Sequence, residues 1–96
     1  MDGFDPLIHQ PVRLRIMSAL AALGAGEQID FTRLRELLEV TDGNLGAHLA
    51  RLEKADYVHL AKSFVRRKPR TFIVATDLGR HAFARHVKAL EEVLRS

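Results

Sequence analysis

Five positively charged side chains fall within ten consecutive residues, and the chemistry that they favour is the binding of anions. Residues 61–70 contain no acid and five basic residues: Lys62, Arg66, Arg67, Lys68 and Arg70. An arginine guanidinium presents a planar fork of N–H donors that matches phosphate oxygens, and a lysine supplies a point charge. The first 60 residues carry six basic and nine acidic side chains, so the formal charge of +3 is concentrated in this window. The window predicts contact with a polyanion; a solvated charged loop is the alternative.

A second group of polar side chains lies on an amphipathic segment, residues 41–55, with the sequence TDGNLGAHLARLEKA. Leu45, Leu49 and Leu52 recur at spacings of four and three, which places them on one side of a helix. The opposite side is small and partly basic, as suits a helix laid against a large anion. The residues that we expect to contact DNA from this helix are Thr41, Asn44, Ala47, His48 and Arg51.

Each of these side chains has a structural alternative. Arg51 can bind guanine edges or a phosphate, or it can be a solvated surface residue. Asn44 can pair with adenine or serve only in local capping of the helix. Thr41 is an N-cap whose hydroxyl can also reach a phosphate. His48 lies near the leucine stripe, where half-buried packing competes with a contact to a base.

The histidines do not predict a metal site. The chain has five histidines and no cysteine, which excludes disulfides and thiolate metal sites. His81 and His86 are five residues apart and therefore do not share a helical face. A histidine and carboxylate site shared across a dimer is the alternative, but we expect no metal and no cofactor. The chain also lacks a glycine-rich phosphate loop, a nucleophile motif and a pair of catalytic acids, so we expect no enzymatic activity.

The elements that must hold these residues can be read from the spacing of apolar positions. Pro11 opens a helix that Gly24 and Gly26 end. A minimal strand follows around Ile29, and Thr32 can cap the next helix. The apolar positions of the two helices are Val12, Ile16, Leu20 and Leu23 in the first, and Leu34, Leu37 and Leu38 in the second. Only residues 40–41 separate the second helix from the segment 41–55, and so tight a joint indicates a helix-turn-helix.

After residue 55 the apolar period changes to two, which predicts a β-hairpin over residues 57–75 with a basic tip. Thr76 can cap a final helix over residues 76–95. This helix carries a heptad-like seam of Phe83, Val87, Leu90 and Leu94. A long terminal helix with such a seam usually needs a partner, although the seam can also complete the core of one chain. We expect a dimer interface formed by Phe4, Leu7, Ile8, Phe83, Val87, Leu90, Val93 and Leu94.

The order helix, strand, helix, helix, hairpin, helix is that of a winged helix-turn-helix, a mainly α fold with a small β-hairpin. We expect residues 1–96 to form a single DNA-binding domain, with 41–55 as the recognition helix, 57–75 as the wing and 76–95 as the dimerisation helix. No apolar run approaches the roughly 18 residues of a membrane span, and Met1 leads into polar residues. We therefore expect a cytoplasmic protein that does not enter membranes.

The segments TDGNLGAHLARLEKADYV and RRKPRTFIVATDLGR resemble the compact winged helix-turn-helix transcriptional regulators related to the MarR and ArsR families. The resemblance runs over roughly residues 8–90. It implies a homodimeric repressor or activator of transcription whose helix from Thr41 enters the major groove of double-stranded DNA. The wing would then touch the backbone or the minor groove, and the terminal helices would pair. A two-fold dimer would read an inverted repeat with half-sites about one helical turn apart.

The sequence departs from the ArsR pattern at Gly43, Gly46 and Ala47, where those relatives often carry hydroxyl, amide or imidazole groups. Two glycines weaken a helix by about 1 kcal/mol each relative to alanine. Either the small residues let the backbone approach DNA closely, or base readout by this helix is weak. A winged helix used only as a protein-interaction module is therefore the alternative function. A small-molecule effector between the terminal helices and the core is a further option that no residue identifies.

Overall fold

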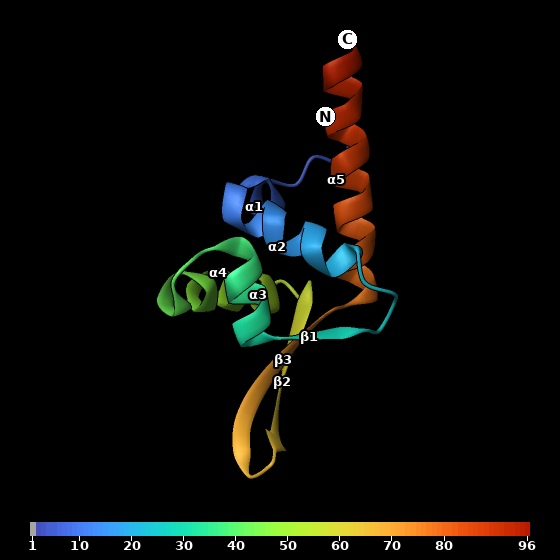
Figure 1. Cartoon of the computed structure of the whole chain (residues 1–96). Helices are drawn as coiled ribbons and strands as arrows, with labels where there is room; N and C mark the ends of the chain where they lie inside the picture. Colours follow the sequence, from blue (N-terminus) through green and yellow to red (C-terminus); the bar gives the residue numbers. More distant parts are fainter. Residues whose placement is uncertain (1) are drawn as a thin grey trace.

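The computed structural model describes residues 2–96, and in this range it contains five helices and three strands (Figure 1). In chain order they are α1 (Pro6–His9), α2 (Pro11–Ala21), β1 (Gln28–Asp30), α3 (Phe31–Leu38), α4 (Asp42–Lys54), β2 (Val58–Val65), β3 (Lys68–Ala75) and α5 (Asp77–Arg95). The predicted winged helix-turn-helix order is confirmed, and α1 is an addition. None of these helices is long and apolar enough to cross a membrane.

The short helix α1 was not among the elements predicted from the sequence. Asp5 caps it, because a carboxylate oxygen of Asp5 accepts hydrogen bonds from the backbone N–H groups of Leu7 and Ile8. Pro6 follows as the first helical residue, where a missing N–H has no consequence. The turn packs Ile8 completely into the core. Ile8 therefore has no exposed surface for a second copy of the chain, and we remove it from the predicted dimer interface.

The three strands form an antiparallel sheet in the order β1-β3-β2. Ile73 lies at its centre, opposite Ile29 of β1 and Leu60 of β2. Because β1 pairs only with residues 72–74, the outer half of the β2–β3 hairpin is a two-stranded ribbon that projects from the body (Figure 1). Pro69 lies in this part, where β3 has one neighbouring strand and a proline is tolerated. We call residues 57–75 the wing.

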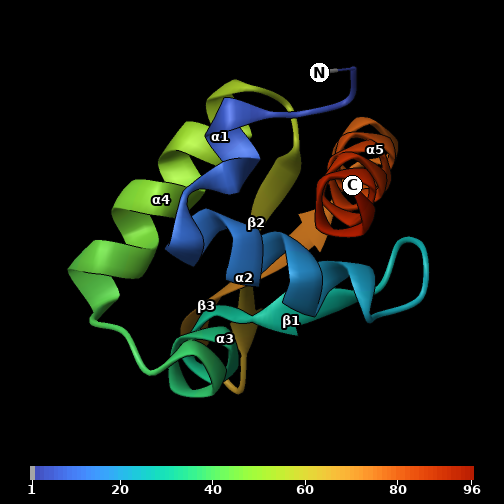
Figure 2. The ribbon, with the colours of Figure 1, turned by 90° about the horizontal axis from the view of Figure 1, so that it is seen from above.

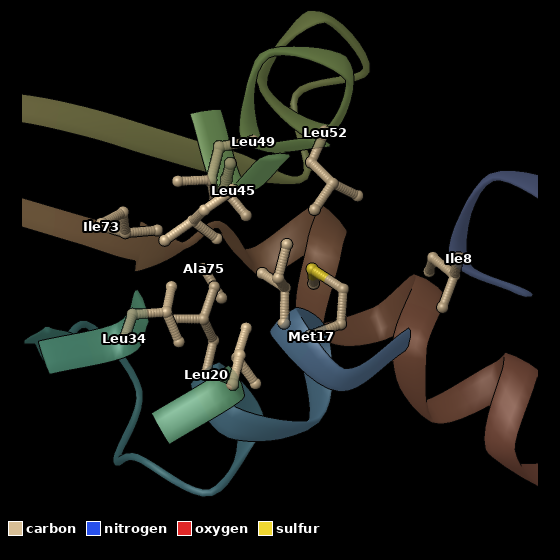
Figure 3. Close-up of a cluster of buried hydrophobic side chains, with 12 residues drawn as sticks. Ile8, Met17, Leu20, Leu34, Leu45, Leu49, Leu52, Ile73 and Ala75 are labelled. Atoms are coloured by element: carbon tan, nitrogen blue, oxygen red, sulfur yellow. The ribbon is translucent and has the colours of Figure 1, made fainter. Parts of the chain in front are cut away.

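The core lies between the helices and the inner half of the sheet. Leu45, Leu49 and Leu52 of α4 are fully buried, close to Met17 and Ile73 (Figure 3). Full burial of one leucine side chain contributes about 1.5–3 kcal/mol, so these three residues hold α4 firmly against the body. The predicted leucine stripe is confirmed.

Three details of the predicted helices are wrong. Leu37, expected in the core, is 48% exposed. Thr32 does not cap α3, because the helix already begins at Phe31 with Asp30 as N-cap and no side-chain capping bond. The helix α2 ends at Ala21, three residues before Gly24. The guanidinium of Arg80 in α5 donates to the carbonyl oxygens of Leu20, in the last turn of α2, and of Leu23, just beyond it (3.4 and 3.3 Å).

Helix α5 lies on the opposite side of α2 from α4 (Figure 2). Thr76 caps it by accepting from the N–H of Gly79 (2.9 Å) and donates its own hydroxyl to the carbonyl of Asp56. The C-terminal half of α5 extends beyond the body at the end opposite the wing, which gives the molecule extents of 53 × 24 × 21 Å (Figure 1). The predicted final helix, with its threonine cap, is confirmed.

Candidate nucleic-acid interface

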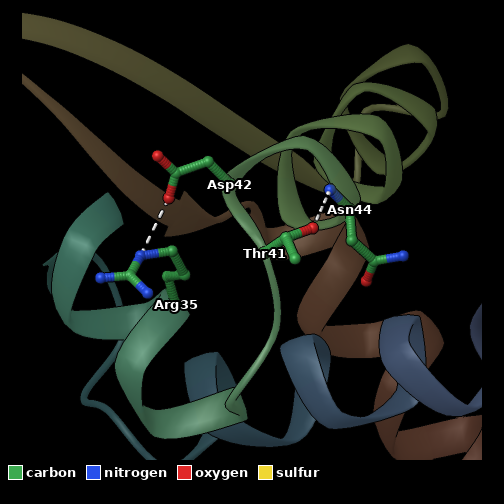
Figure 4. A network of polar contacts seen from close by, with 4 residues as sticks. All are labelled: Arg35, Thr41, Asp42 and Asn44. Carbon is green, nitrogen blue, oxygen red and sulfur yellow. Dashed lines mark hydrogen bonds and ion pairs between the residues drawn. The ribbon is translucent and has the colours of Figure 1, made fainter.

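The joint between α3 and α4 is tight and held by two polar contacts. Glu39 ends α3 in the left-handed conformation (φ 54°), which turns the chain within three residues. Thr41 then caps α4, accepting from the N–H of Asn44 (3.1 Å), and Arg35 pairs with Asp42 across the joint (2.9 Å; Figure 4). The two helices are therefore fixed to each other as a helix-turn-helix.

Four of the predicted DNA-contacting residues form a single row along α4. They are spaced three, four and three residues apart, which aligns them on one flank of the helix beside the buried leucines: Thr41, Asn44, His48 and Arg51. Thr41, Asn44 and Arg51 are exposed and His48 is half-buried. We call these four residues the polar row. Ala47 is exposed next to the row, and its small side chain projects little from the helix surface.

Sequence reasoning missed Arg13, a residue of α2 that contacts the polar row from beneath. Arg13 is 8% exposed, and its Nη1 lies 3.0 Å from Nδ1 of His48. Its Nε donates to the carbonyl oxygen of Leu7 in α1. Burial, followed by the positive charges of Arg13 and Arg51, lowers the pKa of His48, so the ring is neutral near pH 7. One signal could have found Arg13: with Ile16, Met17 and Leu20 it completes an i, i+3, i+4, i+7 pattern of otherwise apolar core residues.

The tip of the wing is a two-residue turn made of Arg66 and Arg67. Both have positive φ values (53° and 66°), as a type I′ hairpin turn requires. Side chains other than glycine, asparagine and aspartate are unfavourable there, by about 1–2 kcal/mol per residue. Both arginines are exposed, and neither pairs with an acid among residues 2–96. The chain thus holds two charged side chains at its outermost point despite the backbone strain.

The other cations of the wing do not form one cluster. The register places Lys68 and Arg70 on one face of the ribbon and Lys62 on the other. All three are exposed. Nη1 of Arg70 lies 3.8 Å from Oδ2 of Asp30 at the end of β1, so part of the charge of Arg70 is compensated within the chain. Lys62, Lys68 and the two arginines of the turn have no acid partner among residues 2–96 and are the cations most available to an external anion.

The predicted dimer residues lie along α5 and the N-terminal segment. Phe83, Val87 and Leu90 are half-buried, whereas Val93 and Leu94 are 45% and 83% exposed. Phe4 and Leu7 are half-buried beside α5 and α2. The part of α5 that faces the core is a different stripe, formed by Gly79, His86 and Ala89. The seam lies beside this stripe: Phe83 packs against the core, whereas Val93 and Leu94 at its far end are exposed.

Within residues 2–96, no group of three or more histidine or acidic side chains is arranged to hold a metal ion. His9 and His86 approach each other, but only as a pair (3.3 Å between Nδ1 and Nε2).

Comparison with known proteins gives consistent matches over most of the chain. A family model described as a winged helix DNA-binding domain matches residues 12–94. An uncharacterized protein of Methanocaldococcus jannaschii is 36% identical over 81 residues, which cover 84% of this chain and 85% of that protein. The structure of a transcriptional regulator homologue from Pyrococcus horikoshii OT3 is similar with a TM-score of 0.84 and 30% identity, covering 93% of this chain and 85% of the other.

A third match is the structure of NadR in complex with 4-hydroxyphenylacetate. Its TM-score is 0.63 at 28% identity, with 93% of this chain and 68% of that chain covered. The matches confirm the resemblance to winged helix-turn-helix transcriptional regulators.

Proposed function

The chain belongs to the winged helix DNA-binding domain family, and from this premise we propose that it is a homodimeric transcriptional regulator that binds a specific duplex site. In this proposal α4 enters the major groove and the wing contacts the sugar-phosphate backbone or the minor groove. The family and the fold are those of regulators, and we propose no enzymatic activity.

The observation that carries the proposal is the polar row on α4. Three fully buried leucines fix one side of this helix, and the neighbouring flank presents hydroxyl, amide, imidazole and guanidinium groups in line. These are the side chains that hydrogen-bond to base edges and phosphates. The major groove is wide enough to admit an α-helix. The uncompensated arginines of the wing tip add contacts that depend on charge alone.

The homodimer part of the proposal is supported by the seam of α5. Its residues Val93 and Leu94 are exposed, and the C-terminal end of α5 projects beyond the body. A second copy of the chain, related by a two-fold axis, would bury them against the same residues of its own α5. Two copies would then place two α4 helices on one face of the duplex. The expected operator is an inverted repeat with half-site centres 10–10.5 base pairs apart, or a multiple of that spacing.

A small-molecule effector is a further part of the proposal. An apolar hollow of about 560 Å³ opens between the end of α2 and the first half of α5, lined by Ala21, Arg80, Phe83 and Val87 among others. Phe83 and Val87 belong to both the hollow and the seam, so a ligand here would contact the dimer interface. The complex of NadR with 4-hydroxyphenylacetate shows that a similar protein binds an aromatic acid. Arg80 lines the hollow beside Asp77, and its guanidinium already donates to the carbonyl oxygens of Leu20 and Leu23.

Selection from a random duplex pool tests the function directly. We expect enrichment of an inverted repeat, and binding to it that weakens as salt concentration rises, because phosphate contacts release counterions. Retention of no duplex even at low salt would overturn the proposal and favour a protein-interaction module. Enrichment of a single asymmetric half-site would retain DNA binding and overturn the dimeric mode.

A further inference from the structure

Arg13 is a buried cation with an unusual set of partners. It forms no ion pair with any acid among residues 2–96. Its guanidinium is instead held between the carbonyl oxygen of Leu7 and Nδ1 of His48, which lies 35 residues away in sequence. Burial and the nearby charge of Arg51 lower the pKa of Arg13, but an arginine remains protonated in proteins. A charged donor is therefore placed permanently against one nitrogen of a histidine on α4.

This contact determines the tautomer of His48. A guanidinium has only N–H donors, so Nδ1 of His48 must accept the hydrogen bond and cannot carry a hydrogen. The ring is neutral, and its one N–H is therefore on Nε2. The two ring nitrogens point in divergent directions. With Nδ1 turned toward Arg13 of α2, Nε2 points away from Arg13, and His48 as a whole is half-buried.

We propose that Arg13 fixes His48 as the Nε2–H tautomer, and that this N–H is the hydrogen-bond donor that His48 offers to an acceptor atom of DNA. The inference rests on the proposed function, because the acceptor belongs to the duplex that α4 would contact. Arg13 is a positioning residue: it does not touch DNA but decides whether His48 donates or accepts. Without it, both tautomers of a neutral histidine would be populated.

The neighbours of His48 indicate what kind of base edge this donor would face. Asn44 and Arg51 lie one turn before and one turn after it in the polar row, and both can donate. A row of donors favours acceptor atoms, and O6 and N7 of guanine are two such acceptors in the major groove that the Nε2–H of His48 could meet. A phosphate oxygen is the other acceptor within the same chemistry. The experiment below separates the two.

The tautomer is tested on the free protein, without DNA. Long-range nitrogen–proton NMR spectra distinguish a protonated from an unprotonated ring nitrogen. We expect Nδ1 of His48 to be unprotonated and Nε2 to be protonated at pH 7.5. In Arg13→Met, which keeps an unbranched apolar stem but has no hydrogen-bond donor, we expect both tautomers; Arg15→Met, at an exposed arginine of the same helix, is the control. A protonated Nδ1 in the wild type would overturn the proposal.

The donor role is tested by DNA binding of His48→Leu and His48→Gln. The leucine variant removes the donor and should bind the selected duplex roughly tenfold more weakly, whereas the glutamine amide can replace the Nε2–H donor and should restore most of the affinity. In the Arg13→Met background the leucine substitution should have a smaller effect, because the donor is already only partly populated. His81→Leu, an exposed histidine of α5, serves as a control.

Two further duplexes distinguish the acceptors. If the weakening by His48→Leu disappears when one guanine is replaced by 7-deazaguanine, the acceptor is the N7 atom of that base. If it is equal on the selected duplex and on an unrelated duplex, the acceptor is a phosphate oxygen. Unchanged affinity of His48→Leu on every duplex that the wild type binds overturns the inference. A wild type that binds no duplex overturns instead the proposed function and leaves the tautomer measurement standing.

Discussion

The backbone N–H of Asp5 donates to Nδ1 of His86 (2.9 Å), a histidine with no exposed surface in the middle of α5. A backbone N–H can only donate, so Nδ1 of His86 must accept this hydrogen bond. His86 is therefore neutral and carries its hydrogen on Nε2, which lies 3.3 Å from Nδ1 of His9. His9 must then accept. The ring of Phe4 packs beside both imidazoles, with ring centroids 4.7 and 5.1 Å away. One tautomer of each histidine thus fastens the N-terminal segment to α5.

This pair predicts that acid destabilises the fold. Burial, and then the neighbouring His9, lower the pKa of His86 below its usual 6.5, although Asp5 acts weakly in the opposite sense. Between the lowered pKa and 6.5 the unfolded chain binds more protons than the folded chain, so the free energy of unfolding falls as the pH drops through this window. Above about pH 7.5 it should not depend on this group. Urea unfolding between pH 7.5 and 5 measures the effect.

His86→Phe keeps a ring of similar size but cannot titrate, so its free energy of unfolding should vary less with pH, whatever its absolute stability. His48, whose pKa is lowered as well, contributes in the same direction and leaves part of the dependence in place. The exposed His81→Gln is the control and should retain the full dependence. Equal pH slopes for the wild type and His86→Phe would contradict this account.

For single residues, the sequence predicts which side chains lie on the surface of α4, but it does not predict the hydrogen-bond partners of buried side chains. Thr41, Asn44 and Arg51 could be assigned to the outside of α4, because local periodicity alone determines their positions. Arg13 and His86 could not be assigned, since their partners are 35 and 81 residues away and only the tertiary fold brings them together. His48 was placed correctly as half-buried, but its hydrogen-bond polarity follows from Arg13.

Among the elements, α5 depends on a glycine in its first turn. A Cβ at Gly79 would lie 2.0 Å from the backbone oxygen of Tyr57, which cannot move without displacing the base of the wing. Gly79→Ala should therefore lower the free energy of unfolding by roughly 2–3 kcal/mol, despite the better helix propensity of alanine. Urea unfolding measures this, and a variant as stable as the wild type would show that the two elements can separate.

Gly43→Ala in α4 is the matched comparison and separates the two explanations for the small residues of this helix. Nothing lies within 4 Å of a Cβ at Gly43, so alanine should stabilise the protein by about 0.5–1 kcal/mol. If the backbone of α4 approaches DNA closely, the same variant should bind the selected duplex more weakly while being more stable. Unchanged affinity would mean that Gly43 does not face the duplex at close range.

The turn of the wing predicts a similar exchange between stability and binding. Replacing Arg66 and Arg67 by Asn and Gly supplies the residues that a type I′ turn prefers and should raise the free energy of unfolding by about 1–2 kcal/mol. The same double variant should bind DNA more weakly. The slope of log affinity against log salt should flatten by roughly 0.9 for each arginine that neutralises a phosphate. An unchanged slope would remove the turn from the interface.

Element positions were predictable where a local pattern and a cap agree. Thr41 and Thr76 each precede a periodic stripe, and each caps its helix as expected. Where the cap was weak the prediction failed: α3 begins before Thr32 without a side-chain capping bond. Helix α2 also stops short of its glycines, and Arg80 of α5 contacts its end. The latter contact joins residues 60 positions apart, beyond the reach of any local pattern.

For the molecule as a whole, the functional groups are distributed along its long dimension. The wing lies at one end, the polar row near the middle and the exposed end of α5 at the other (Figure 1). The fold class followed from the order of elements. The overall shape did not, because the direction in which α5 leaves the body depends on the packing of Gly79, Arg80 and His86 against other elements. The seam begins at the core with Phe83, but its far end, Val93 and Leu94, is exposed.

The last prediction concerns this seam. A wild-type chain at low micromolar concentration should sediment as a dimer, and Leu90→Glu should convert it to a monomer, because the buried charge would have no partner in a two-fold interface. Leu78→Glu is the control, since Leu78 is 55% exposed on the first turn of the same helix and lies outside the seam. The monomeric variant should still bind a single half-site, but weakly, because the second half-site no longer benefits from an effective concentration. If Leu90→Glu remains dimeric, the interface lies elsewhere on the chain; if the wild type is a monomer, each α4 acts alone, and the inverted repeat is no longer the expected operator.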